Sequence, residues 1–151
     1  MANKAEVEKF IPVVSLVKAY ADEIGMEKAL AVLTKWSLEL MKAGFQKVMS
    51  EKGITVKDIK SLYLVNKFFE EEMGWGAEHW DFKETEDSIT WKVKNCPVPE
   101  ACAAVSFPAD KFCQAITASL SEIDAFINPD LKWTGKFEPE EGCPNEITMR
   151  V

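Results

Sequence analysis

The spacing of apolar positions changes halfway along the chain, and the change predicts two halves of different structure. In the first half, apolar residues recur every three or four positions, as on one face of an α-helix. This pattern predicts a helix over residues 13–24, with Pro12 in its first turn and Gly25 directly after its end. Residues 2–11 are then expected to form a separate arm or a short helix.

Two further helices are expected before the period changes. The longer one covers residues 26–52, with apolar positions at helical spacing and Gly53 as its stop. The next begins with Thr55 as the capping residue and Asp58 three positions later, and it ends at Gly74. The first half of the chain is therefore expected to be entirely helical.

The second half opens with a pattern of period two. Apolar and polar residues alternate over residues 89–93, which is typical of a strand with one buried face. The same alternation is present at Trp80 and Phe82, and the polar residues 84–87 lie between the two segments. These three segments predict a β-hairpin.

A helix and two more strands are expected to complete the second half. The stretch over residues 97–108 is rich in proline and is expected to be a loop. A single helix is predicted over residues 109–127, where the Asn-Pro pair ends it. Alternation returns over residues 131–137 and 147–151, which predicts two further strands.

Together these elements predict an α+β fold: a helical N-terminal half packed on a four-stranded antiparallel sheet with one crossing helix. Its 151 residues, 47% of them apolar, suffice for one core, so we expect a single domain over 1–151, with the helical half at 1–74 and the sheet and helix at 75–151. The long second helix and the N-terminal arm carry more apolar surface than a small sheet can cover. A homodimer formed through them is therefore expected.

Charge and hydropathy narrow the classes of partner and the location. The chain has 18 basic and 25 acidic residues, a net charge of −7, and Arg150 is its only arginine. Such a chain repels phosphate backbones, so no nucleic-acid partner is expected. The sequence has no apolar run near the ~20 residues that cross a bilayer and no secretory signal pattern, so no membrane partner and a cytoplasmic location are expected.

The four cysteines are the first candidates for chemistry. In a reducing compartment they are expected to be thiols, and no two are spaced as in a zinc finger or ribbon. Cys96 ends a predicted strand, Cys113 lies one turn into a predicted helix, where its pKa would be lowered, and Cys143 precedes the last strand. These three could meet at one end of the sheet, whereas Cys102 is expected to be buried or incidental. The competing interpretation is that all four are small core residues.

Two further residues could move a proton. His79 is the only histidine, so a Cys–His pair or a Cys/His metal site would need it, although a lone histidine is more often a surface residue. Asp110 lies three residues before Cys113, where it is either a base or a first-turn acid that complements the helix dipole.

Three segments carry a family resemblance: VKNCP at 93–97, FPADKFC at 107–113, and the stretch from INPD at 127–130 to GCPNEI at 142–147. From residue 93 onwards the chain resembles the L-2-amino-thiazoline-4-carboxylic acid hydrolase-like family, and more distantly the 4-vinyl reductase type of ligand-binding domain. A Cys-Pro after a strand, a Cys in the next helix and a late Cys recur in these families. Cys96, Cys113 and Cys143 fill those places, and Cys102 has no counterpart.

Three hypotheses about function remain open. The first is a cytoplasmic hydrolase-like enzyme that acts on a small cyclic or amide-like substrate, in which Cys96 or Cys113 supplies the thiolate and His79 or Asp110 moves the proton. The second is a non-catalytic small-molecule- or metal-binding module, in which Cys96, Cys113 and Cys143 are ligands of zinc, iron or haem. The third is a structural subunit that contacts another protein through its helices.

Overall fold

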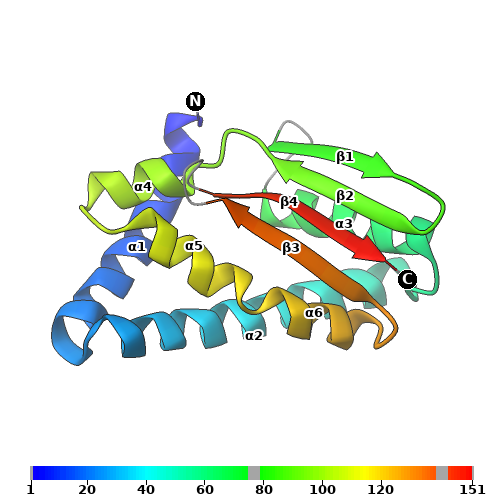
Figure 1. Cartoon of the computed structure of the whole chain (residues 1–151), viewed down its shortest axis with the longest axis horizontal. Helices are drawn as coiled ribbons and strands as arrows, with labels where there is room; N and C mark the ends of the chain where they lie inside the picture. Colours follow the sequence, from blue (N-terminus) through cyan, green and yellow to red (C-terminus); the bar gives the residue numbers. More distant parts are fainter. Residues whose placement is uncertain (1, 75–78, 139–142, 151) are drawn as a thin grey trace.

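The computed structural model describes residues 2–74, 79–138 and 143–150, and for residues 80, 82, 133–138 and 143–150 it describes the backbone only. Within these residues the chain runs through three helices, a hairpin, three more helices and two final strands (Figure 1). Their bounds are α1 (Lys4–Ile24), α2 (Met26–Lys52), α3 (Ile59–Met73), β1 (Trp80–Glu84), β2 (Ser88–Val93), α4 (Val98–Ala104), α5 (Ala109–Thr117), α6 (Leu120–Ile127), β3 (Lys132–Glu138) and β4 (Cys143–Arg150).

The first helix is longer than the sequence pattern predicts. The expectation of a separate N-terminal arm is wrong, because α1 runs without interruption from Lys4 through Pro12 to Ile24. Asn3 caps it, with its side-chain oxygen accepting a hydrogen bond from the amide of Ala5 at 3.0 Å. Pro12 removes one backbone hydrogen bond, but its ring lies on the exposed side and apolar residues before and after it pack into the same cluster.

The next two helices agree with the prediction except at one end. The bounds of α2 are those expected, and Gly53 ends the helix in the left-handed conformation at φ 64°. The predicted cap at Thr55 is wrong, because Asp58 is the capping residue of α3. Its carboxylate accepts from the amide of Ser61 at 2.8 Å, and the Ser61 hydroxyl accepts from the amide of Asp58 at 3.1 Å. Gly74, at φ 75°, ends α3 as predicted.

The predicted hairpin is confirmed. Trp80 pairs with Val93 and Phe82 with Trp91 in an antiparallel register. The strand order in the sheet is β1-β2-β4-β3, and every neighbouring pair is antiparallel. The buried side chains of Ile89 and Trp91 place one face of β2 against the helices.

The predicted fold class is wrong in the number and the arrangement of its helices, which make up most of the molecule. Two helices, α5 and α6, replace the single crossing helix, because the stretch predicted as one helix is interrupted at Ala118 and Ser119. A third helix, α4, forms in the proline-rich stretch that was expected to be a loop. The buried Ser119 hydroxyl donates to the carbonyl of Ile116 at 2.8 Å, a local bond that competes with a continuous helix. The helical half also does not pack as one layer on the sheet, because α1 packs mainly against α2 and α4.

Two clusters of buried side chains result. The larger one lies between the sheet and the helices α2, α3 and α6, and Leu62, Ile89 and Ile123 are among its most buried members. The second cluster lies between α1, α2, α4 and α5, around Phe112 and Val14. None of the described helices combines the length and the apolar character needed to cross a bilayer.

Candidate functional site

A buried histidine–carboxylate pair joins the first turn of α1 to the start of the sheet. Nε2 of His79 lies 2.9 Å from Oε1 of Glu6, and the two side chains are only 6% and 16% exposed. The backbone fixes the position of the histidine as well, because the amide of Lys94 donates to its carbonyl at 2.7 Å. His79 is therefore neither an exposed residue nor an isolated one.

The local structure explains why Glu6 reaches this place. Its position in the first turn of α1 complements the positive end of the helix dipole. The amide of Ala2 donates to the Glu100 carboxylate at 3.2 Å, which ties the N-terminus to α4. The second carboxylate oxygen of Glu6, Oε2, is buried and has no hydrogen-bond partner within the described residues. A ligand or a water molecule could therefore donate to it.

A small cavity lies beside Glu6. Its volume is about 140 Å³, and its walls are Glu6, Lys9, Phe10 and Val13 from α1 and Met73 and Gly74 from the end of α3. This is smaller than the ~300 Å³ at which sites for drug-sized ligands begin, so the cavity suits a group of a few atoms. The Glu6 carboxylate and the Lys9 ammonium group line this cavity together with the apolar side chains of Phe10, Val13 and Met73.

Three of the four cysteines lie in the second cluster. Cys96 is half-buried in the loop between β2 and α4, Cys102 is fully buried in α4, and Cys113 is buried in α5. The structure thus gathers Cys96 and Cys113 in one cluster, together with Cys102, which was expected to be buried or incidental. Cys143 begins β4, and its side chain lies outside the part of the chain described in full.

Burial makes the Cys102 thiol unreactive. Loss of solvent, together with a smaller effect of the neighbouring Cys96, raises the pKa of Cys102 to about 11. At neutral pH its sulfur therefore stays protonated and is a poor nucleophile. The expectation that Cys102 is buried is confirmed.

Cys113 and Asp110 do not form the pair that their spacing suggests. Cys113 lies past the first turn of α5, beyond the amides that lack helical partners, so activation by the helix end has no support. Asp110 lies in that first turn and is half-buried. Among the residues with described side chains, no hydrogen bond or ion pair joins Asp110 to a thiol or to His79. Its position fits the first-turn acid better than the base.

The described side chains include no cluster of donors for the expected zinc or iron site, and the expected haem remains a prediction. Among the residues that the structure describes, no group of three or more His, Cys, Asp and Glu side chains is arranged to hold a metal ion. The set of Cys96, Cys113 and Cys143 remains a prediction, since the third side chain is outside the description. Metal analysis of the purified protein tests it.

Neither a family model nor a curated protein matches the sequence. The resemblance carried by the cysteine segments therefore remains a prediction. Sequence reasoning also missed Glu6 and Lys9. The only signal for Glu6 was its place in the first turn after Asn3, and nothing local shows its contact with a residue 73 positions away.

Proposed function

We propose that the chain is a cytoplasmic enzyme that hydrolyses a small amide-like or cyclic substrate, with Cys96 as the nucleophile and His79 as the proton carrier. The observation that carries this proposal is the buried contact between His79 and Glu6. A carboxylate at one ring nitrogen orients the imidazole and stabilises the imidazolium that forms when the ring takes up a proton. Without such a partner, a buried histidine would resist protonation.

The course of the chain supports Cys96 as the thiol. The backbone of His79 is bonded to Lys94, and Cys96 follows two residues later, so both approach the same corner of the sheet. The side chain of Cys96 packs against the second cluster, and so do Val7, which follows Glu6 in the chain, and Phe10, which lines the cavity beside Glu6. Of the three described thiols it is the only one with partial exposure.

The proposed reaction balances with water as the second substrate. Proton transfer from Cys96 to His79 gives the thiolate, which attacks the carbonyl carbon of the substrate. The carbon–nitrogen bond then breaks, and the imidazolium gives its proton to the leaving amine. Water, deprotonated by the imidazole, hydrolyses the thioester, which releases the acid and restores the thiol. The Lys9 ammonium group at the cavity edge favours a substrate that carries a small anionic group.

A model ester tests the nucleophile without knowledge of the natural substrate. With p-nitrophenyl acetate, the proposal expects one equivalent of p-nitrophenolate in a burst and an acetyl group on Cys96, identified by peptide mass spectrometry. Cys96→Ser should abolish the burst and His79→Gln should slow it at least tenfold, whereas Cys102→Ala, provided that its circular dichroism is unchanged, should retain it. An acetyl group on Cys102, or an undiminished burst in Cys96→Ser, would overturn the proposal.

A further inference from the structure

The helix α2 carries a second apolar line on the side that the fold leaves open. Its buried line includes Leu33 and Phe45, which pack into the two clusters. Val32, Trp36 and Leu40 follow one another at intervals of four and are 48%, 47% and 41% exposed. Residues four apart lie on one face of a helix, so these three side chains form a continuous exposed stripe.

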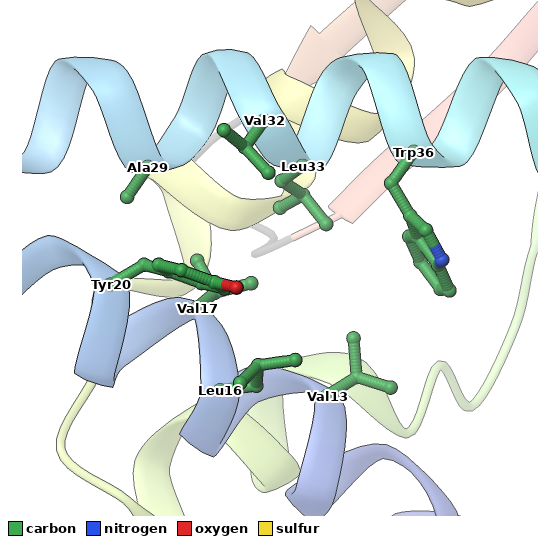
Figure 2. A pocket seen from close by; sticks show the side chains of 8 residues that line it. All are labelled: Val13, Leu16, Val17, Tyr20, Ala29, Val32, Leu33 and Trp36. Carbon is green, nitrogen blue, oxygen red and sulfur yellow. The ribbon is translucent and has the colours of Figure 1, made fainter.

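The stripe borders a groove between α1 and α2. Figure 2 shows Leu16 and Tyr20 extending from α1 towards the gap and Val32 and Trp36 bordering it from α2. The groove has a volume of about 260 Å³, and all eight side chains that line it are apolar or aromatic. Leu16 and Tyr20 are 58% and 45% exposed, so the apolar surface continues across both helices. Continuous apolar patches of this kind mark contact surfaces.

We propose that a second copy of this chain covers the stripe and the groove, with the two α2 helices antiparallel about a twofold axis at Trp36. An interface of this symmetry requires one patch to be complementary to itself. The stripe meets this requirement, because Val32 lies four residues before Trp36 and Leu40 four residues after it. In the antiparallel arrangement, Trp36 faces Trp36, and Leu40 of each copy lies over Val32 and the groove of the other.

Charges beside the stripe favour the antiparallel arrangement over the parallel one. Lys35 and Glu39 are both exposed and lie on either side of the centre at Trp36. Both lie on the same flank of the stripe, so antiparallel helices bring Lys35 of one copy near Glu39 of the other, whereas parallel helices place these flanks on opposite sides of the contact, where the charges do not meet. The occupant with the matching charge pattern is thus another copy of the same surface.

The outer face of the two helices sets an upper limit on the size of the interface. Helices rise 1.5 Å per residue and are about 10 Å wide, so the full lengths of α1 (21 residues) and α2 (27 residues) together present at most a face on the order of 700 Å². A stable interface takes about 800 Å² from each partner. The inference is independent of the proposed chemistry, since it uses none of the residues assigned to the reaction.

Light scattering coupled to size exclusion, at micromolar concentration, gives the first test. The expected mass is twice the 17.0 kDa of the chain. Trp36→Glu should give a monomer, whereas Leu64→Glu, at a position on α3 that is 43% exposed, should remain a dimer. Circular dichroism shows whether each variant is folded. A monomeric wild-type chain, or a folded Trp36→Glu variant that stays dimeric, would overturn the proposal.

Two further variants test the geometry and do not depend on the folding of Trp36→Glu. Lys35→Glu should weaken the dimer at least tenfold, and adding Glu39→Lys should restore it. A residue on the axis faces its own copy, so Trp36→Cys should form a covalent dimer on mild oxidation, while Leu64→Cys should not. Equal cross-linking of the two variants, or failure of the charge exchange to restore the dimer, contradicts the antiparallel arrangement.

Discussion

Glu6 and Asp124 are both carboxyl groups that the fold removes from water, but among the described residues only Glu6 has a hydrogen-bond partner. Glu6 lies 2.9 Å from His79 and is 16% exposed. Asp124, on α6, is 2% exposed, and neither of its oxygens has a hydrogen-bond partner among the described residues. Burial alone raises the pKa of Asp124 to about 7.

Because of this difference, the two buried carboxyl groups have different roles. A paired carboxylate can stay ionised, so it can hold an imidazole in place and support proton transfer. An unpaired carboxyl group favours its neutral form, because the charged form has lost its contacts with water and no protein group replaces them. Asp124 lies between Ile123 and Ile127, both members of the larger core, so the fold must accommodate it as a neutral acid.

Replacing Asp124 should have the largest effect, and the effect should depend on pH. The pKa rises from 3.8 in the unfolded chain to about 7 in the folded protein, so between these values the folded state holds a proton that the unfolded state has released. The free energy of unfolding therefore falls as the pH rises from about 4 to about 7, by roughly 4 kcal/mol at most, and stays low above pH 7.

Asp124→Asn has nearly the same shape and does not titrate, so its stability should lack this component. Urea denaturation of both proteins at pH 4.5 and pH 8 measures the difference. The wild-type chain should lose more stability than the variant between the two pH values. If both lose the same amount, Asp124 is charged or solvated in the folded state, and the contrast with Glu6 fails.

The Glu6–His79 pair should show strong coupling. Removing either partner leaves the other buried without its contact, so Glu6→Gln and His79→Gln should each lower the free energy of unfolding by about 2–3 kcal/mol. The double variant should cost clearly less than the sum. The exposed pair of Lys47 and Glu72, with atoms 2.8 Å apart and side chains about half exposed, is the control and should show no measurable coupling. Additive effects at Glu6 and His79 would show that the contact does not stabilise the fold.

The two carboxyl groups also show which features a sequence reveals. The helix over residues 26–52 and the β1–β2 hairpin were predictable because a local period and a stop residue define each. The continuity of α1 through Pro12 and the interruption at Ser119 were not, because tertiary packing and a buried hydroxyl decide them. The contact between Glu6 and His79 joins two distant segments, and the burial of Asp124 depends on which helix face meets the core.

The Cys102 thiol is a third kind of buried acid and can be compared with the carboxyl groups of Glu6 and Asp124. Within the described part of the chain no group stabilises the thiolate of Cys102, and with a pKa of about 11 only on the order of one molecule in a thousand is ionised at pH 8. Labelling of Cys102 by iodoacetamide should therefore rise about tenfold per pH unit from pH 7 to pH 10. Cys96, which is partly exposed, should be labelled faster throughout, as followed by peptide mass spectrometry. Faster labelling of Cys102 at pH 7 would mean that its surroundings open to solvent.

The smallest effect is expected where a buried polar contact carries no charge. The hydroxyl of Thr34 on α2 donates to the carbonyl of Ala115 on α5 at 2.8 Å and to that of Leu30 at 3.0 Å. Thr34→Val keeps the shape and removes the donor, so it should lower the free energy of unfolding by about 1 kcal/mol. Because no titrating group takes part, the loss should be the same at pH 4.5 and pH 8, unlike that expected for Asp124. A loss that changes with pH would mean that the protonation of Asp124 affects the contact between α2 and α5. The surroundings of Asp124 and of Thr34 would then not be independent.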